Sequence, residues 1–245
     1  ALGGRECWIT DWPGGGRSGG RDPLELAYED LVDGYVALLE EVIGRPAVVV
    51  CHSMGGAITW KLVERARPLV AAVAAIGASY PGNIAPVCEV LADDGTALRL
   101  RFAASGVEFT VRRDRLYRYD DAYVFDQGLS TSTRFPRERV DAFRASLVGI
   151  PPRVLLQRLG MDGGLPRVEE TATFAGLRVR LVAGTEDPAH TREIDARTVE
   201  LLRGWGADAE LVCLADRGIC GNGHFLFHER NSVEILELVR GEIEE

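Results

Sequence analysis

The chain has 245 residues, of which 46% are hydrophobic, so it can bury the core of one large domain and is not a disordered chain. Its net charge is −9, and acidic and basic residues are interspersed along it. This pattern argues against nucleic acid or an anionic membrane as partner, because both favour a basic protein face. No run of 18 apolar residues occurs, so the sequence predicts no membrane span.

The first part of the chain predicts a strand and then a helix. Residues 6–12 (ECWITDW) are expected to form a short buried strand that ends at a glycine-rich loop. The helix is expected to start with Asp22 as N-cap, Pro23 at the first helical position and Glu25 completing a capping box. Apolar residues then recur at helical spacing until Gly44.

Strands and helices alternate in two further parts of the chain, which predicts a mostly parallel α/β sheet. The predicted strands are 47–51, 70–76, 177–183 and 210–214, and the predicted helices are 54–66, 191–204 and 231–243.

The alternation stops between Tyr80 and Thr173, where several turn-forming stretches separate short amphipathic pieces. Expected elements here are a hairpin and two short helices: 96–102 with 107–113, then 137–147 and 154–159. We interpret residues 80–173 as a cap or lid insertion in a core that is formed by residues 1–79 and 174–245.

The stretch VVVCHSMGGA joins a predicted buried strand to a predicted helix, with Ser53 at the junction. Such a strand–serine–helix turn is typical of a nucleophile elbow, which needs tiny residues two places before and after the serine, here Cys51 and Gly55. The positive end of the following helix would face the reaction centre, and the backbone N–H of Met54 would donate to an oxyanion there. The alternative is an ordinary turn with a chance serine.

A serine hydroxyl needs a base, and the sequence offers four histidines. His224 lies in a glycine-lined loop just after a predicted last strand, from which it could bend toward Ser53, so we favour it. The imidazole of His52 is fixed within the elbow and is expected to point away from the serine. His190 is interpreted as a surface or helix-start residue, and His228 as packed or solvated.

The acid that orients the base is expected near the end of another strand. Asp187 is preferred over Glu186 because the residue before a proline is held extended. A plain solvated turn is the alternative for this pair. Asp216 lies too close in sequence to His224 to be the first choice.

On these residues the chain resembles the α/β-hydrolase superfamily. The matching stretches are TDWPGGGRSGG, VVVCHSMGGA, LVAGTEDP and GICGNGHFLFHERNS. The last of these is similar to the G-N-G-H loop of bacterial esterase-like serine hydrolases. The resemblance implies acyl transfer to water without a cofactor or metal, on a small-molecule ester, in which Ser53 attacks, His224 shuttles the proton and Asp187 orients the imidazole.

Substrate binding is assigned to Trp12, His52 and Tyr80. For Trp12 the reason is that the resemblance places the loop after the first predicted strand at the border of the active site. Five aromatic residues of the insertion are candidates for an acyl or alcohol pocket, although they could equally hold the insertion together: Tyr117, Tyr119, Tyr123, Phe125 and Phe135.

Compared with the superfamily, the first three strands are missing before residue 6, and with them the loop that supplies a second oxyanion donor. We therefore expect the sequence to be an N-terminally incomplete version of a longer chain. Without the third strand, the edge of the predicted strand 47–51 would stay open or pair directly with residues 6–12.

Several functions remain open at this stage. A thioesterase, lactonase or acyltransferase would show the same motifs as a carboxylic ester hydrolase, and a non-catalytic small-molecule-binding protein of the same fold is a further alternative. The five cysteines lack metal-ligand spacing and are odd in number, so free thiols in a reducing, cytoplasmic compartment are expected. The sequence does not indicate an oligomeric state.

Overall fold

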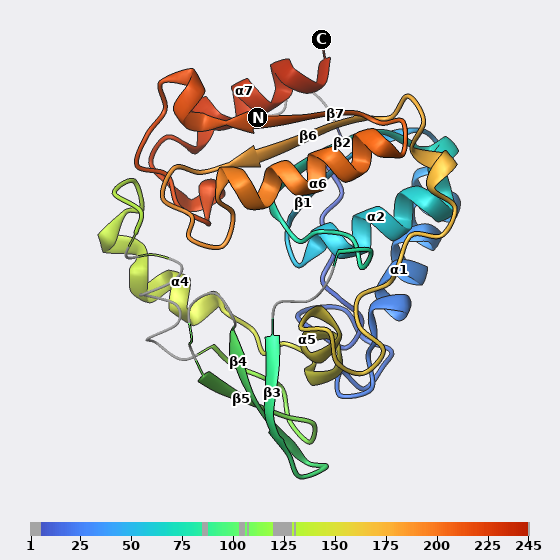
Figure 1. Cartoon of the computed structure of the whole chain (residues 1–245), viewed down its shortest axis with the longest axis vertical. Coiled ribbons are helices and arrows are strands. Elements are labelled where there is room, and N and C mark those ends of the chain that lie inside the picture. The colour runs from blue at the N-terminus through green and yellow to red at the C-terminus, as the bar shows by residue number, and fades with distance from the viewer. Residues whose placement is uncertain are drawn as a thin grey trace.

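The central feature of the computed structural model is a four-stranded sheet (Figure 1). The structure describes residues 6–84, 88–102, 106, 108–119, 129 and 131–244. The strands are β1 (Ala47–Ser53), β2 (Val70–Ala78), β6 (Arg178–Ala183) and β7 (Asp208–Cys213). They lie in the order β1-β2-β6-β7, and each pair is parallel. The predicted parallel α/β sheet is therefore confirmed.

Helices cover both faces of this sheet because its strands are apolar on both sides. Along β2, Val73 and Ala75 face the cluster that contains residues of α2 (Gly55–Ala66) and α6 (Arg192–Gly204). The alternate residues Ala74 and Ile76 face the cluster under α7 (Ser232–Glu244). Figure 1 shows α6 in front of the sheet and α7 along its upper side.

The first helix starts later than predicted. Helix α1 spans Tyr28–Ala37 and continues as the π-helix η1 (Leu38–Ile43). Asp22 does not cap it: its Oδ1 accepts from the backbone N–H of Leu24 at 2.9 Å, which closes an Asx turn instead. Glu25 lies in the same turn, and Asp30 is the residue whose carboxylate accepts from the N-cap backbone N–H.

The strand predicted for residues 6–12 is wrong. These residues have no strand assignment, and Trp8 and Ile9 are 47% and 92% exposed. Apolar residues form a strand only where a neighbouring strand pairs with their backbone. No ladder forms here, although Glu6 forms an ion pair with Arg45, two residues before β1.

Segment 80–173, called the insertion from here on, extends from the core at the bottom of Figure 1. Its antiparallel sheet is formed by β3 (Cys88–Asp93), β4 (Ala97–Phe102) and β5 (Glu108–Arg112). The predicted hairpin is β4–β5, whereas β3 was not predicted because its residues are half-buried or exposed without regular alternation. The short helices here are η4 (Arg137–Arg139), α4 (Val140–Ser146), α5 (Pro152–Arg158) and η5 (Thr171–Phe174).

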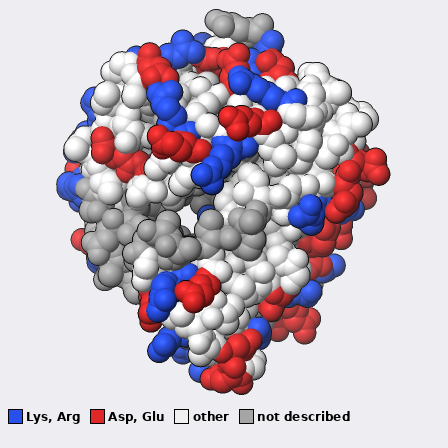
Figure 2. All heavy atoms as spheres, in the orientation of Figure 1, with Lys and Arg blue, Asp and Glu red and all other residues white. Residues whose placement is uncertain are grey.

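Three short 3-10 helices connect elements of the core: η2 (Arg67–Leu69), η6 (Leu214–Arg217) and η7 (Leu226–His228). Within the described ranges, none of the helices has the length and apolar character that crossing a bilayer requires. Figure 2 shows acidic and basic side chains intermixed on one face, and a hollow between the core and the insertion.

No disulfide joins any of the five cysteines. Cys51 and Cys213 are buried, whereas Cys7 is exposed because residues 6–12 do not form a buried strand. Burial raises the pKa of Cys51 to about 12, so this thiol beside the elbow stays protonated and is not a nucleophile at neutral pH.

Candidate active site

Ser53 lies where β1 passes directly into α2. Its φ is +49°, a left-handed conformation that a non-glycine residue adopts only at a cost. Met54 follows in a right-handed conformation, and the helix begins at Gly55. The carbonyl of Ser53 accepts from the backbone N–H of Ser79 at 2.8 Å, which fixes the turn to the end of β2. This is the strand–turn–helix arrangement that the sequence predicts.

The tightest contact of the turn is at Gly56. A Cβ at Gly56 would lie 2.4 Å from the carbonyl oxygen of Ser79, whereas a Cβ at Gly55 would lie 3.6 Å from the Cβ of Cys51. A side chain is therefore excluded more strictly at Gly56 than at Gly55, because α2 passes directly against the chain after β2 at Gly56.

Asp187 and His224 form a hydrogen-bonded pair in loops that follow β6 and β7. Nδ1 of His224 lies 2.6 Å from Oδ2 of Asp187, and Oδ1 of Asp187 accepts from the backbone N–H of Ala189 at 3.0 Å. Asp187 is only 5% exposed. Burial raises the pKa of Asp187, but the hydrogen bond and the charge of His224 outweigh it, so that the pKa lies below its usual value. Asp187 is therefore an ionised acceptor.

The other acidic candidates are engaged elsewhere or face solvent. Glu186 is exposed although it precedes Asp187 directly. Asp216 forms an exposed ion pair with Arg192 at 2.6 Å. Within the described residues, neither carboxylate forms a hydrogen bond or an ion pair with His224, so Asp187 is the acid that the structure brings to this imidazole.

Gly77 provides the space for the pair. This residue of β2 has a φ of +45°, and a Cβ there would lie 3.1 Å from Nδ1 of His224 and 3.2 Å from Oδ2 of Asp187. The imidazole and the carboxylate therefore lie against a backbone position without a side chain. Sequence reasoning missed Gly77, whose only signal is a glycine within an otherwise apolar strand.

His52 connects the serine turn to the His224 loop. Its Nε2 lies 2.9 Å from the carbonyl oxygen of His224, and because a carbonyl only accepts, this nitrogen carries the hydrogen. The two rings are tilted with centroids 4.6 Å apart. The residue beside Ser53 thus contacts the loop of the candidate base. Burial, followed by the charge of His224, lowers the pKa of His52 to about 3, so that its ring stays neutral.

A second imidazole–carboxylate pair lies next to the first. Nδ1 of His190 is 3.0 Å from Oδ1 of Asp195, and both residues are buried. The ring of His190 stacks on that of His224 with centroids 5.5 Å apart. Of the two interpretations of His190, the surface residue is wrong, because its loop folds inward beside Asp187, whereas the helix-start residue agrees with its place directly before Thr191, the N-cap of α6. His228 is exposed and its ring packs edge-on against Phe143, which agrees with the prediction of a packed or solvated residue.

These residues are also the candidates for a metal centre. Asp187, His190 and His224 each offer a ligand atom within 4.8 Å of the others. However, the two rings are nearly parallel, at 15°, and the Nδ1 atom of each is already paired with a carboxylate. A bound ion lies in the plane of each imidazole that ligates it, so the arrangement fits hydrogen bonding better than metal coordination.

The His224 loop is held by a buried network around Glu229. Glu229 is 3% exposed and accepts from the backbone N–H of Gly223 at 2.7 Å, from Ser132 Oγ at 2.6 Å and from the amide of Asn222. Ser132 belongs to the insertion. Sequence reasoning missed this network, since a glutamate five residues after a histidine is not by itself a signal.

The same loop is bonded to the insertion along residues 132–138. The carbonyl of Gly221 accepts from the backbone N–H groups of Thr133 and Arg134, at 3.0 and 3.2 Å. The backbone N–H of Arg230 donates to the carbonyl of Arg134, and its side chain pairs with Glu138 at 2.8 Å. This part of the insertion, called the clamp below, is therefore bonded to the His224 loop at several points.

Trp12, Met54 and Tyr80 meet in one apolar cluster with residues of α1, α2 and α5. His52, the third residue to which substrate binding was assigned, lies apart from this cluster at the His224 loop. Of the predicted pocket aromatics, Tyr117 and Tyr119 pack against each other and Phe135 packs against Phe143 within the insertion. Tyr123 and Phe125 lie outside the described residues.

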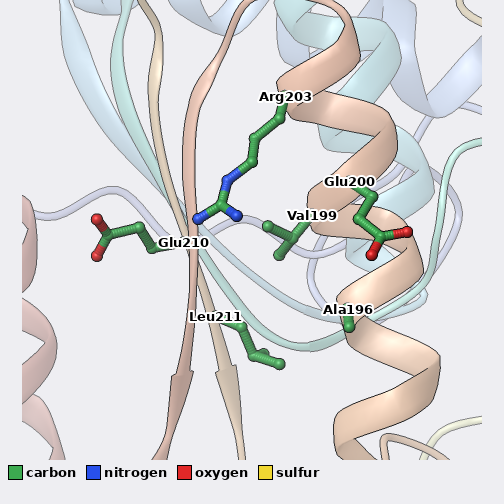
Figure 3. A pocket seen from close by; sticks show the side chains of 6 residues that line it. All are labelled: Ala196, Val199, Glu200, Arg203, Glu210 and Leu211. Carbon is green, nitrogen blue, oxygen red and sulfur yellow. The ribbon is translucent and has the colours of Figure 1, made fainter.

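A groove between α6 and β7 lies on another part of the surface (Figure 3). Its lining residues are Ala196, Val199, Glu200, Arg203, Glu210 and Leu211. The guanidinium of Arg203 already forms a hydrogen bond within the protein there, because its Nε donates to the carbonyl of Ala209 at 2.7 Å. The groove contains none of the predicted site residues.

The chain belongs to the α/β-hydrolase family. The model of this family, described as "Alpha/beta hydrolase family", matches residues 1–238, in agreement with the parallel sheet, the turn at Ser53 and the pair Asp187–His224.

Similar proteins include esterases and a lipase. A probable secreted lipase, phiG, from a fungal species (strain ATCC 74256) is 24% identical over 94% of this chain, and the chain spans 57% of that relative's length. The fold is similar to that of the Arabidopsis methylesterase MES16, with a TM-score of 0.60 and 16% identity over 95% of this chain and 84% of that one. The fold is also similar to that of a thermophilic esterase, with a TM-score of 0.54 and 18% identity over 95% of this chain and 79% of that one.

Proposed function

We propose that this α/β hydrolase is a serine hydrolase that cleaves a carboxylic ester through a Ser53–His224–Asp187 triad. The observation that carries the proposal is the Asp187–His224 hydrogen bond of 2.6 Å, in a loop that His52 connects to the serine turn. The esterase and lipase relatives support the same class of reaction.

In this proposal each residue has its own step. Asp187 holds the hydrogen of His224 on Nδ1, which leaves Nε2 as the base. Nε2 takes the proton of Ser53 as its Oγ attacks the ester carbonyl carbon, and returns it to the departing alcohol. Water then attacks the acyl-serine with the same proton transfer, which releases the acid and restores Ser53.

Met54 is proposed to donate one hydrogen bond to the oxyanion. It follows Ser53 at the N-terminal end of α2, where backbone N–H groups have no partner within the helix and the helix dipole favours negative charge. Such a donor is worth about 10²- to 10³-fold in rate.

A fluorophosphonate probe tests the proposal, because it labels activated serines covalently. We expect stoichiometric labelling of the protein, no labelling of Ser53→Ala and unchanged labelling of Ser146→Ala, an exposed serine of α4. Hydrolysis of p-nitrophenyl esters should likewise be lost in Ser53→Ala and retained in Ser146→Ala. Labelling that persists in Ser53→Ala contradicts the proposal, and a folded protein that is neither labelled nor active indicates a non-catalytic binding protein.

A further inference from the structure

The mechanism proposed above does not use the pair His190–Asp195, although both side chains are buried. They are 5% and 4% exposed, and Nδ1 of His190 lies 3.0 Å from Oδ1 of Asp195. A buried pair of this kind is a weak source of stability, because the loss of hydration offsets most of the attraction. Its place directly beside the pair Asp187–His224 points to a role other than stability.

The hydrogen bond between His224 and Asp187 does not by itself set the plane of the imidazole. Nδ1 of His224 is held 2.6 Å from Oδ2 of Asp187, but one hydrogen bond lets the ring turn about the line between these two atoms. The side-chain torsion that turns a histidine ring has broad minima, and Gly77 contributes no side chain on the side of β2. Packing must therefore fix the direction in which Nε2 points.

Among the rings that contact His224 in the described structure, the ring of His190 lies nearly parallel to it. The two planes are inclined by 15° with their centroids 5.5 Å apart, whereas His52 is tilted by 43° and Phe225 stands at 80°. Stacked rings at this spacing are a favoured aromatic arrangement. A turn of the imidazole about its hydrogen bond would break the stacking, so His190 opposes that turn.

His190 is itself held from two directions. Its backbone N–H donates to the carbonyl of Asp187 at 3.4 Å, so a tight turn joins it to the acid. Its ring is bonded to Asp195 in the first turn of α6, a helix whose N-cap is Thr191 and whose Val199 lies in the hydrophobic core. The stacking ring is therefore attached to a packed helix, which is what a supporting residue of a site requires.

We propose that His190 is a positioning residue of the hydrolase, which fixes the plane of the His224 ring by stacking and so directs Nε2 toward Ser53. Asp195 holds the stacking ring through its hydrogen bond. The inference rests on the proposed function and deepens it, because it gives the second pair a part in the same proton transfer. A misdirected base has a large effect, since a displacement of about 1 Å can lower the rate about 10²-fold.

The test separates the ring of His190 from its hydrogen bond. His190→Asn keeps a nitrogen donor for Asp195 near the position of Nδ1 but removes the stacked ring. The double variant His190→Phe with Asp195→Leu keeps a flat ring and replaces the hydrogen-bonded pair by apolar residues. With p-nitrophenyl butyrate, His190→Asn should lower kcat about 10- to 100-fold at unchanged KM, whereas the double variant should keep most of kcat.

Thermal unfolding shows whether these variants are folded. If His190→Asn does not fold, the double variant His190→Leu with Asp195→Leu takes its place, because it fills the space without a flat ring. His228→Asn is the matched control: it removes another imidazole near the same loop, one that packs on Phe143, and should leave kcat unchanged. Full kcat without the ring, or a loss of kcat only in the variant that keeps the ring, overturns the inference.

Proton NMR separates this inference from the proposed function. The hydrogen between Nδ1 of His224 and Oδ2 of Asp187 should resonate far downfield of the amide hydrogens, because its bond is short and charge-assisted, and Asp187→Asn should remove the signal. In a Ser53→Ala background, the signal should persist in the variant with phenylalanine at position 190 and broaden in the variant with asparagine there.

The outcomes then divide as follows. If no ester is hydrolysed but the downfield signal depends on a flat ring at position 190, the stacking role stands and the proposed function fails. If hydrolysis depends on Ser53 but neither kcat nor the signal distinguishes the two variants, the role of His190 is wrong and the hydrolase stands.

Discussion

The two edges of strand β1 differ in whether a neighbouring strand pairs with them. One edge pairs with β2 from Ala47 to Ser53. The other edge has no strand partner within the described residues, and Val48 and Val50, which point to one face of the sheet, are 41% and 58% exposed. On the paired side Val73 of β2 is fully buried. One strand thus has a core edge and a surface edge.

The difference shows that the candidate site depends on the paired edge. The turn at Ser53 is bonded to Ser79 after β2, Gly77 of β2 makes room for the imidazole, and Asp187 and His224 follow β6 and β7. An open apolar edge, in contrast, is a template for pairing with another chain. Variants on the two sides should therefore affect different properties.

The largest effect is expected on the paired side, from Asp187→Asn. The amide cannot accept the Nδ1 hydrogen as a carboxylate does, so His224 loses its orientation and tautomer, and kcat should fall about 10³- to 10⁴-fold. Glu186→Gln, at the exposed neighbouring position, should retain activity. Steady-state kinetics on p-nitrophenyl butyrate measure both, and equal losses in the two variants contradict the assignment of the acid.

Gly77→Ala tests how closely β2 approaches the pair. The new methyl group meets His224 and Asp187 at about 3 Å in a left-handed backbone conformation, which should cost about 2–4 kcal/mol of unfolding free energy and most of the activity. Gly34→Ala in α1, where nothing lies within 4 Å, should stabilise by about 1 kcal/mol. Urea unfolding compares them, and a fully active, stable Gly77→Ala protein rules out this packing.

A pair of valine variants compares the two edges directly. Val73→Ala should cost about 2 kcal/mol, because it leaves a cavity in the core, whereas Val50→Ala should cost less than about 0.5 kcal/mol. Light scattering on heating should decrease in Val50→Lys, since a charge blocks edge pairing. Similar unfolding free energies for Val73→Ala and Val50→Ala would mean that the open edge is covered in solution.

The smallest effect concerns the pH dependence of stability through His52. Its pKa is lowered to about 3 in the folded protein, while the unfolded chain binds a proton near pH 6.5. Between these values the unfolded state holds more protons, so stability falls as the pH falls, by about 1 kcal/mol at pH 5.5. His52→Gln keeps a donor for the carbonyl of His224 but does not titrate.

The measurement is urea unfolding at pH 7.5 and pH 5.5 for both proteins. The difference between the two pH values should be smaller in His52→Gln by about that amount. An identical pH dependence in the two proteins would show that His52 is not held neutral.

The sequence predicted the elements that have a clear local pattern, either a continuous apolar run or alternating apolar and polar residues. These include β1, β2 and the hairpin β4–β5. It also predicted the turn at Ser53, because that turn needs small residues at fixed places. It failed at residues 6–12, where strand formation depends on a neighbour, and at Asp22, where an Asx turn replaces a cap. The first failure reflects long-range pairing, which a local pattern does not contain, and the second reflects competition between two local hydrogen-bond patterns.

For the candidate site, the sequence could rank Asp187 above Glu186 but could not foresee what surrounds it. Gly77, the pair His190–Asp195 and the Glu229 network come from segments far apart in the chain. Their roles depend on the order of strands in the sheet, which places the ends of β2, β6 and β7 side by side. Contacts between residues that are far apart in the chain cannot be read from the residues one at a time.

The clamp has a consequence for how a substrate can enter. Gly221 and Arg230, which hold residues 132–138, flank His224 on both sides in the chain. If that half of the insertion swung away, it would pull the imidazole from its carboxylate and leave an entered substrate without a base. A movement of residues 132–138 and the order of the Asp187–His224 pair are therefore expected to be coupled.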